Sequence, residues 1–160
     1  MCGIAGFVDQ TLNNVQQQEG LNSMLQAIAH RGPNFRNTFF HHAVGLGHNR
    51  LSVIDLTSGG NQPKEFKDWV IVFNGEVYNY LELRSELQLL GYTFTSNSDT
   101  EVVLSAYDCW GKAAIQKMVG MWSMVIYNKK TQRLFVSRDR FGIKPFYYTF
   151  INGRFYFASE

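Results

Sequence analysis

Residues 2–9 read Cys2-Gly3-Ile4-Ala5-Gly6-Phe7-Val8-Asp9, a short apolar run that ends at a charged residue. A run of this length and composition is typical of a buried β-strand. A lone cysteine beside apolar residues is more often a buried structural thiol. Its position changes that interpretation, because removal of Met1 would leave Cys2 with both a thiol and a free α-amine. With reference pKa values of about 8.5 for the thiol and about 7.7–8.0 for the amine, the amine can accept the thiol proton near neutral pH.

The composition is that of one globular domain. The chain has 160 residues, which is enough to bury a sizeable core. Hydrophobic residues make up 45% and charged residues 18%, so nothing indicates disorder. Aromatic residues reach 15%, and they stand beside β-branched residues in short runs, which favours a core rich in β-sheet.

Charge and cysteine content exclude several classes of protein. The formal net charge of +2 is too small to indicate a nucleic-acid or anionic-membrane partner. No apolar run approaches the roughly 20 residues of a membrane span, and the N-terminus lacks the basic start of a signal peptide. The two cysteines, Cys2 and Cys109, form neither a disulfide framework nor a zinc motif. We therefore expect a reduced, cytoplasmic protein with no metal site, no nucleic-acid partner and no membrane partner.

Hydrophobic periodicity predicts a mixed α and β chain with antiparallel pairing. Apolar residues at helical spacing, with capping or stop signals beside them, predict helices at 21–28, 83–90, 98–110 and, more briefly, 112–118. Strands are expected at 38–44, 46–54, 69–73, 121–128, 133–139, 146–150 and 154–159. Residues 55–67 are rich in Gly, Asn and Pro and indicate a loop. Tight turns are expected at 128–132 and at Asn152-Gly153.

Six motifs in series carry a family resemblance. They are Cys2-Gly3-Ile4-Ala5-Gly6, His30-Arg31-Gly32-Pro33, Arg50-Leu51-Ser52-Val53-Ile54-Asp55, Phe73-Asn74-Gly75-Glu76-Val77-Tyr78-Asn79, Ser98-Asp99-Thr100-Glu101 and Arg138-Asp139-Arg140-Phe141-Gly142-Ile143-Lys144-Pro145. This series resembles the class II (N-terminal nucleophile) glutamine amidotransferases, and within them the glutamine-hydrolysing asparagine synthetase type. The resemblance covers nearly the whole chain. It implies an α+β fold, the αββα sandwich of N-terminal nucleophile hydrolases, with two mainly antiparallel sheets between helical layers and the domain at residues 2–160.

The resemblance also implies a role for each site residue. Cys2 is expected to be the nucleophile, and the Asn74 side-chain NH2 and the Gly75 N–H to form the oxyanion hole. Glycine at 75 would let the backbone approach the substrate closely. Arg50 is expected to bind the α-carboxylate of glutamine and Asp99 its α-ammonium. The remaining lining is expected from Leu51, Ser52, Val53, Ile54 and Glu76.

Each assignment has a structural alternative. Asn74-Gly75 could be a hairpin turn, and Arg50 could be a surface strand residue. Asp99 could be a helix N-cap, a role that is compatible with substrate binding. Ser58-Gly59-Gly60 lacks the continuation of a phosphate-binding loop, so a mobile loop near the glutamine site is expected there. Cys109 is expected in the core.

Two further observations concern residues outside the expected site. Family members usually carry Asp after Arg-Gly-Pro, whereas this chain has Asn34, which puts in doubt any salt bridge of that loop. The histidines stand in no Cys/His signature and are expected to be structural or exposed; they are His30, His41, His42 and His48.

The activity implied is hydrolysis of the L-glutamine side-chain amide through a Cys2 thioester. The ammonia would serve an ATP-dependent C-terminal asparagine synthetase domain that amidates aspartate. That domain is not in this sequence, and we expect the chain to be a piece of a longer protein. ATP and Mg²⁺ are expected only in the synthetase domain, with no cofactor in this one. A homodimer is one assembly that such a protein could form.

Two other functions remain open. The same glutaminase domain could feed a different synthetase, one that amidates a surface sugar acid or closes a peptide. A catalytically silent structural or interaction module is the second alternative.

Overall fold

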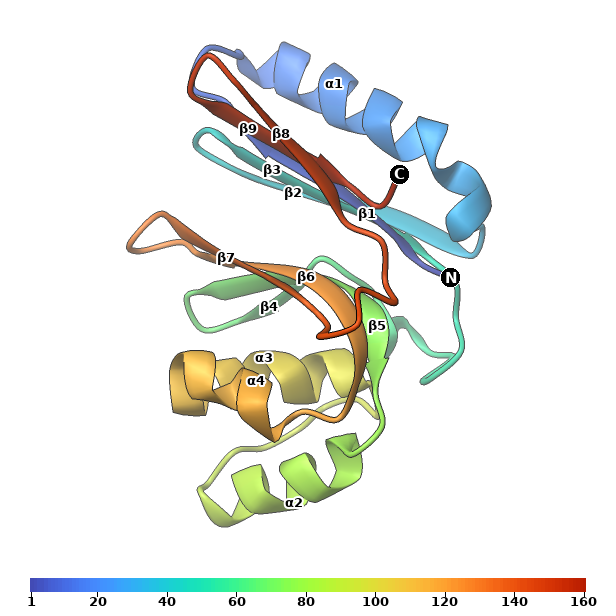
Figure 1. Cartoon of the computed structure of the whole chain (residues 1–160), viewed down its shortest axis with the longest axis vertical. Coiled ribbons are helices and arrows are strands. Elements are labelled where there is room, and N and C mark those ends of the chain that lie inside the picture. The colour runs from blue at the N-terminus through green and yellow to red at the C-terminus, as the bar shows by residue number, and fades with distance from the viewer.

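Two β-sheets lie face to face between helical layers in the computed structural model, which describes all 160 residues (Figure 1). Helix α1 (Asn14–Ala27) covers the outer face of the first sheet. Helices α3 (Asp99–Trp110) and α4 (Ala114–Lys117) cover the outer face of the second, with α2 (Tyr80–Leu89) beyond them. The expected αββα sandwich is confirmed.

The first sheet has β1 at its centre, in the strand order β2-β3-β1-β9-β8. All of its pairings are antiparallel, including those of β1 with β3 and with β9. The bounds are Gly3–Val8 for β1, Phe35–His41 for β2, Val44–Arg50 for β3, Tyr147–Ile151 for β8 and Arg154–Ala158 for β9. The N-terminal strand is therefore paired on both sides, which fixes the position of the chain start.

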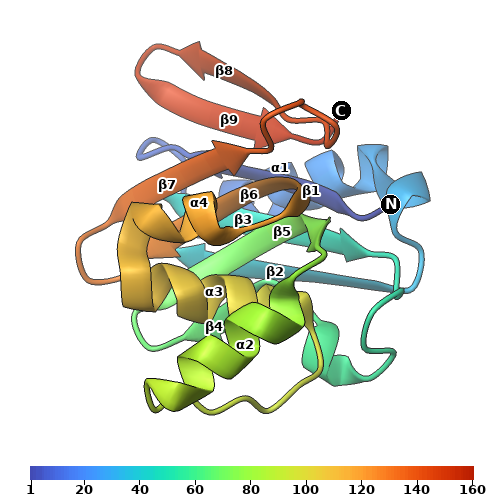
Figure 2. The ribbon, with the colours of Figure 1, turned by 60° about the horizontal axis from the view of Figure 1, so that its bottom comes forward.

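The second sheet has the order β4-β5-β6-β7 and is also antiparallel. Its strands are β4 (Lys64–Phe66), β5 (Trp69–Val77), β6 (Gly120–Asn128) and β7 (Arg133–Arg138). Figure 2 shows α2 and α3 crossing the face of this sheet, with the β8–β9 hairpin at the far side of the molecule.

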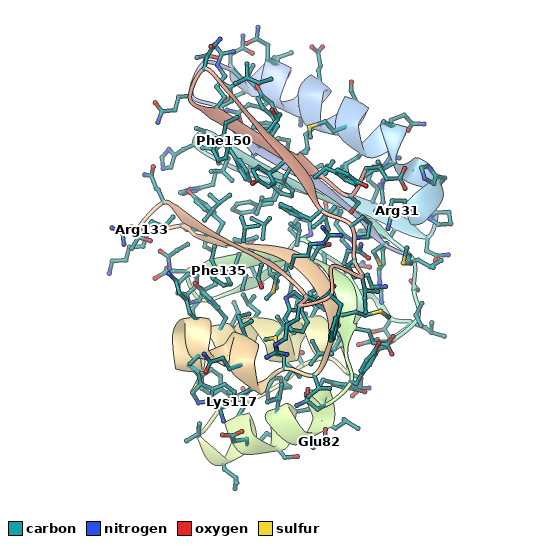
Figure 3. All side chains as sticks on the ribbon, in the orientation of Figure 1. Arg31, Glu82, Lys117, Arg133, Phe135 and Phe150 are labelled. Carbon is teal, nitrogen blue, oxygen red and sulfur yellow. The ribbon has the colours of Figure 1, made fainter.

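The core has three parts, of which one lies between the first sheet and α1 and includes Leu21 and Leu25. Alternation along β5 and β6 separates the other two. One set of side chains fills the space between the sheets and includes Ile4, Leu46, Val72, Val125 and Tyr127. The residues between them on β5 and β6 face the helices and include Ile71, Phe73, Trp122 and Met124. Each fully buried large apolar side chain contributes about 1.5–3 kcal/mol. Figure 3 shows both interiors filled, with Glu82 and Lys117 on the outer helical layer.

The observed elements differ from the predicted ones at several boundaries. Strand β3 ends at Arg50, not at 54, because its partner β2 begins opposite Arg50. Strand β5 runs on to Val77 because β6 pairs with its whole length. Helix α1 begins seven residues before position 21, at Asn14, where Asn13 and Gln16 form a reciprocal capping box. The short strand β4 lies inside the predicted loop 55–67.

The tight turns follow local chemistry. Asn152 and Gly153 have φ values of 50° and 77°, the left-handed backbone that an Asn-Gly hairpin turn requires. The turn between β6 and β7 also uses a left-handed residue, Gln132, with φ 55°. None of the helices is long and apolar enough to span a bilayer.

Candidate active site

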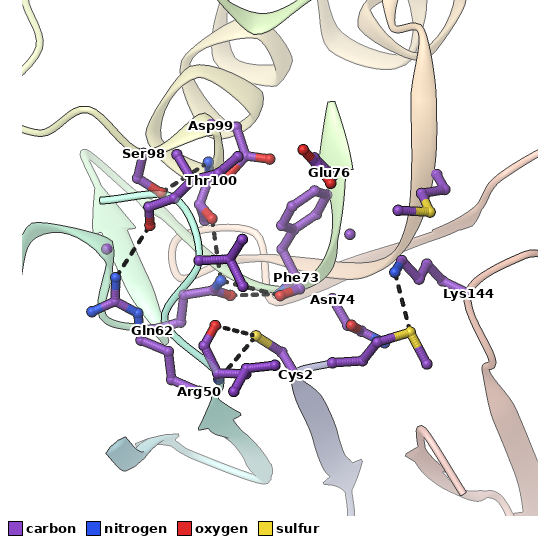
Figure 4. Close-up of a pocket in the computed structure, with 17 residues that line it drawn as sticks. Cys2, Arg50, Gln62, Phe73, Asn74, Glu76, Ser98, Asp99, Thr100 and Lys144 are labelled. Atoms are coloured by element: carbon purple, nitrogen blue, oxygen red, sulfur yellow. Dashed lines mark hydrogen bonds between the residues drawn. The ribbon is translucent and has the colours of Figure 1, made fainter. Parts of the chain in front are cut away.

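A pocket of about 260 Å³ lies at one end of the sandwich (Figure 4). The start of β1, the end of β3, the end of β5 and the first turn of α3 meet there. Its volume is near the lower limit for pockets that hold small organic ligands. Of the residues predicted for the site, those that line it are Cys2, Arg50, Leu51, Val53, Ile54, Asn74, Gly75, Glu76 and Asp99. Ser52 is the one member of the predicted set outside the lining.

The thiol of Cys2 is held against the residue that follows β3. Its Sγ accepts a hydrogen bond from the Leu51 nitrogen at 3.3 Å and lies 3.6 Å from the Leu51 carbonyl oxygen. Burial raises the pKa of the thiol, and this effect exceeds the opposing effects of the Leu51 N–H and the chain-terminal charge. The thiol therefore needs a base beside it to act as a nucleophile.

Met1 lies in the same pocket and is 55% exposed. Its Sδ is 3.3 Å from the Nζ of Lys144 (Figure 4). Removal of Met1 would open the pocket at this point and leave the terminal amine on Cys2.

Asn74 and Gly75 lie inside β5 and do not form a turn. The Asn74 side chain is only 1% exposed, and its Nδ2 donates to no group of the protein. A buried amide donor without a partner costs about 1–3 kcal/mol. Because Asn74 also lines the pocket, a substrate oxygen placed there would give this donor its missing acceptor.

The Gly75 N–H points to the open edge of β5. Along a strand, the backbone groups of alternate residues point to the same side. The Phe73 N–H donates to Gln62 Oε1 at 2.6 Å, and the Val77 N–H donates to Asp99 Oδ2 at 3.1 Å, both on the edge away from β6. The Gly75 N–H lies between them on that edge, beyond the end of β4, which pairs only with residues 69–71. It is available to a ligand.

The packing of β6 gives a structural reason for glycine at position 75. A Cβ there would lie 2.4 Å from the Met121 carbonyl oxygen and 2.8 Å from the Trp122 Cα. Both atoms belong to the neighbouring strand β6. Close packing of β6 is therefore sufficient to exclude a side chain at this position.

Arg50 is a buried residue, not a surface one. Its Nη1 donates to the Thr57 carbonyl at 2.7 Å and to Asn61 Oδ1 at 2.8 Å, and its Nη2 donates to the carbonyls of Ile54 and Asp55. The guanidinium thus holds the loop 51–61 in place. A substrate carboxylate would have to replace some of these oxygens.

Asp99 is the first residue of α3, and the N-cap is Ser98, whose side chain accepts from the Thr100 nitrogen. The Asp99 carboxylate accepts from the Val77 N–H and is otherwise buried without a cation. Burial raises its pKa to about 6, in spite of the backbone donors that act in the opposite direction. An ammonium group in the pocket would supply the missing counter-charge.

Gln62 and Lys144 are buried lining residues for which the sequence predicted no role. Gln62 joins the edge of β5 to α3: its Nε2 donates to the Phe73 carbonyl and to Thr100 Oγ1, each at 3.1 Å. No periodic signal marked it, because it stands in a polar loop. Lys144 belongs to the last family motif, and its side chain reaches the pocket from the loop after β7 (Figure 4).

Asn34 acts as a hydrogen-bond acceptor for the loop. Its Oδ1 accepts from the Ser52 nitrogen at 3.0 Å, and its own N–H donates to the Arg50 carbonyl at 3.0 Å. An amide oxygen can accept from Ser52 as a carboxylate would, so the position of the loop does not depend on the charge of an aspartate.

The histidines and the second cysteine lie outside the pocket. His48 is fully buried between the sheets, and burial lowers its pKa to about 3, so it is neutral at physiological pH. His41 contacts the Tyr127 hydroxyl, and His30 contacts Glu160. Cys109 lies on α3, is half-buried and packs against the core. No group of three or more His, Cys, Asp or Glu side chains is arranged to hold a metal ion.

Comparison with known proteins gives relatives of one kind. The model of the glutamine amidotransferase domain family matches residues 1–160. The chain is 46% identical over 164 residues to asparagine synthetase [glutamine-hydrolyzing] 1 of Bacillus subtilis, covering all of this chain and 26% of that protein. It is 38% identical over 180 residues to a putative asparagine synthetase of Methanocaldococcus jannaschii, covering all of this chain and 34% of the relative.

A third relative has a different name. The fungal amidase chry2 of Gibberella zeae is 39% identical over 173 residues, covering all of this chain and 26% of that protein. The chain thus spans about a quarter to a third of the curated relatives that it matches. Among solved structures, the glutamine phosphoribosylpyrophosphate amidotransferase of B. subtilis superposes with a TM-score of 0.85, covering 99% of this chain and 42% of that one. At 17% identity this likeness shows the fold.

Proposed function

Since the chain belongs to the glutamine amidotransferase domain family, of the kind found in glutamine-hydrolysing asparagine synthetases, we propose that residues 2–160 form a glutaminase domain that works through a Cys2 thioester. The observation that carries the proposal is the meeting of three groups in one pocket. They are the thiol of the second residue, an unpaired buried amide donor at Asn74 and the buried carboxylate of Asp99.

The nucleophile is the Cys2 thiol after Met1 has been removed. The α-amine takes the thiol proton, and the thiolate Sγ adds to Cδ of the glutamine side chain. The C–N bond then breaks, and the amide nitrogen leaves as ammonia with the proton that the amine had accepted. Water attacks the resulting thioester, with the amine again as base. Glutamate leaves and the thiol is restored.

Negative charge develops on the former amide oxygen during both steps. The Asn74 Nδ2 is the first donor for it, because this group is buried, lines the pocket and has no other acceptor. The Gly75 N–H, on the open edge of β5, is the second. Fixed neutral donors of this kind act without rearranging during the reaction.

Recognition of the amino-acid head uses two charges of opposite sign. Asp99 binds the α-ammonium. The positive charge of this ammonium stabilises the buried carboxylate, which has lost its contacts with water. Arg50 binds the α-carboxylate, which displaces some of the loop carbonyls that its Nη atoms contact in this structure. Leu51, Val53, Ile54 and Glu76 complete the lining. Ser52 positions the loop through its bond to Asn34.

The chain covers only 26% of the B. subtilis relative, so we look for the acceptor of the ammonia in a domain outside residues 1–160. We propose an ATP-dependent asparagine synthetase domain that amidates aspartate, because the relatives with that name match this whole chain. ATP and Mg²⁺ would be used only in that domain, and glutamine hydrolysis here would use neither. Two fungal relatives are named amidases, so the alternative is a domain that forms a different amide. A reactive thiol of this kind suits a reducing cytoplasm.

The remaining alternative is a silent module with the same fold. The retained Cys2, together with the unpaired Asn74 donor, argues against it, since a buried unsatisfied amide destabilises the fold unless a ligand uses it.

Ammonia release from L-glutamine tests the proposal. The processed wild-type chain should release ammonia, and Cys2→Ala should not, whereas Cys109→Ala should retain the wild-type rate as the matched control. Equal rates for wild type and Cys2→Ala would reject the thioester route. No release by the processed wild-type protein would favour the silent module.

A further inference from the structure

Lys144 is a buried cation without a counter-ion. The residue is 5% exposed, and its Nζ lies within ion-pair distance of no carboxylate. Its recorded contact is the Met1 sulfur, a weak acceptor, at 3.3 Å. Burying an unpaired ammonium is unfavourable, so its presence in a pocket calls for a reason.

The loop that carries Lys144 is built to hold it in place. Asp139 accepts hydrogen bonds from four backbone N–H groups, those of Trp122, Phe141, Ile143 and Lys144 itself. Burial opposes ionisation of Asp139, but these donors outweigh it and lower the pKa of the carboxyl. Arg138 donates to the carbonyl of Lys144 at 2.6 Å. The backbone at Lys144 is thus fixed from both sides, while its ammonium stays unpaired.

The contact with Met1 places the ammonium beside the chain terminus. Five covalent bonds separate the Met1 sulfur from the nitrogen of Cys2, and Lys144 and Cys2 line the same pocket. Figure 4 shows the Lys144 side chain directed toward the Met1 sulfur, next to Cys2 and Asn74. When Met1 is removed, the thioether leaves and the ammonium faces the new α-amine across the pocket.

The other cations around Cys2 already have oxygen acceptors. Arg31 donates to the Cys2 carbonyl at 3.0 Å, but its charge is paired with Glu160 at 2.7 Å. The Arg50 guanidinium is surrounded by loop carbonyls. The Asp99 carboxylate accepts from the Val77 N–H and has no cation beside it. Glu76 lines the pocket and forms no ion pair with Lys144. Arg50 also acts on Cys2 and lowers the pKa of its thiol. Lys144 is the cation in the pocket lining whose recorded acceptor is a sulfur and not an oxygen.

We propose that Lys144 is an electrostatic tuning residue that keeps the Cys2 amine and thiol pair in its reactive, singly deprotonated form near neutral pH. A neighbouring positive charge disfavours a second positive charge on the amine, and it favours negative charge on sulfur. The same repulsion makes the protonated amine a better acid toward the departing ammonia. Lys144 need not touch the substrate for this. The proposal rests on Cys2 acting as an N-terminal nucleophile.

The test compares Lys144→Met with Lys144→Arg in the chain that has lost Met1. Methionine keeps most of the side-chain volume and removes the charge, whereas arginine keeps the charge. Lys130→Met serves as the matched control, because Lys130 is an exposed lysine in the turn between β6 and β7. Two quantities are measured against pH: kcat/KM for glutamine hydrolysis, and the rate at which iodoacetamide alkylates Cys2, followed on the N-terminal peptide so that Cys109 does not contribute.

Loss of the charge should shift the acid limb of both profiles to higher pH. At pH 7 we expect Lys144→Met to lower both rates by about tenfold, with recovery at high pH. Lys144→Arg should restore the wild-type profile, and Lys130→Met should not change it. Unchanged profiles in Lys144→Met would overturn the proposal. So would an equal loss at every pH that arginine does not rescue, since this would assign Lys144 a packing role.

The alkylation rate separates the two hypotheses. It depends on ionisation of the thiol and not on glutamine. A shifted alkylation profile in a protein that does not hydrolyse glutamine would support the role of Lys144 while rejecting the proposed function.

Discussion

The carboxylate of Asp99 accepts a hydrogen bond from the Val77 backbone nitrogen at 3.1 Å, which ties the first turn of α3 to the last residue of β5. The carboxylate also lines the pocket, and no cation lies beside it. This makes Asp99 the natural partner of a substrate ammonium.

Asp99→Asn should therefore weaken glutamine binding. A hydrogen bond to a charged group contributes about 1.5–3 kcal/mol, so KM for glutamine should rise by about tenfold to a hundredfold, with a smaller change in kcat. Steady-state kinetics check this, with Glu82→Gln as the control, since Glu82 is an exposed carboxylate on α2. An unchanged KM in Asp99→Asn would remove the residue from the recognition of the head group.

The same substitution should stabilise the empty protein at neutral pH. The pKa of Asp99 is raised to about 6 in the folded chain, so the folded state binds the proton more tightly than the unfolded state does. Asp99 therefore lowers the free energy of unfolding as pH rises from about 4 through 6. Urea unfolding without glutamine should show Asp99→Asn to be more stable than wild type by about 1–3 kcal/mol at pH 8 and equal to it near pH 4. A difference that does not vary with pH would contradict this.

Asn74→Ala should act on the chemical step. Removal of one oxyanion donor lowers kcat by about 100-fold to 1000-fold, while KM stays close to wild type. The alkylation rate of Cys2 should not change, because Asn74 donates to the substrate oxygen and not to the thiol. A kcat within twofold of wild type would reject the assignment.

Gly75→Ala should damage the fold before it affects binding. The added Cβ would lie 2.4 Å from the Met121 carbonyl, so β6 must move away from β5. We expect the free energy of unfolding to fall by about 1–3 kcal/mol. The control is Gly20→Ala, a helical position with no atom within 4 Å of the added carbon, where stability should rise by up to about 1 kcal/mol. Full stability in Gly75→Ala would show that β6 does not impose the glycine.

Local chemistry accounts for the parts of the fold that the sequence predicted well. The strand at 2–9, the hairpin at Asn152-Gly153 and the capped start of α3 each depend on residues within a few positions of one another. The series of family motifs predicted that the site residues share one pocket, although these residues come from β1, β3, β5 and α3. Periodicity alone could not predict this, because it carries no information about contacts between distant segments.

Long-range pairing accounts for what was missed. Asn74-Gly75 has the composition of a turn, but nine successive pairs with β6 keep it extended. Gln62 looked like a loop residue, and its role depends on Phe73 and Thr100, which are distant in the sequence. The position of Lys144 depends on the Asp139 carboxylate, which accepts hydrogen bonds from four backbone N–H groups, including that of Lys144. None of these relations has a local signal.

The state of the N-terminus tests the central claim most directly. Two preparations should be compared for ammonia release from glutamine and, by intact mass after acid quench, for one added glutamyl group. The first is the chain processed at Met1, and the second carries one additional alanine ahead of Cys2, so that the thiol remains while its residue has no free amine. We predict ammonia and the glutamyl thioester in the first preparation and neither in the second. Equal rates of ammonia release from the two would contradict the claim that the Cys2 amine is the general base.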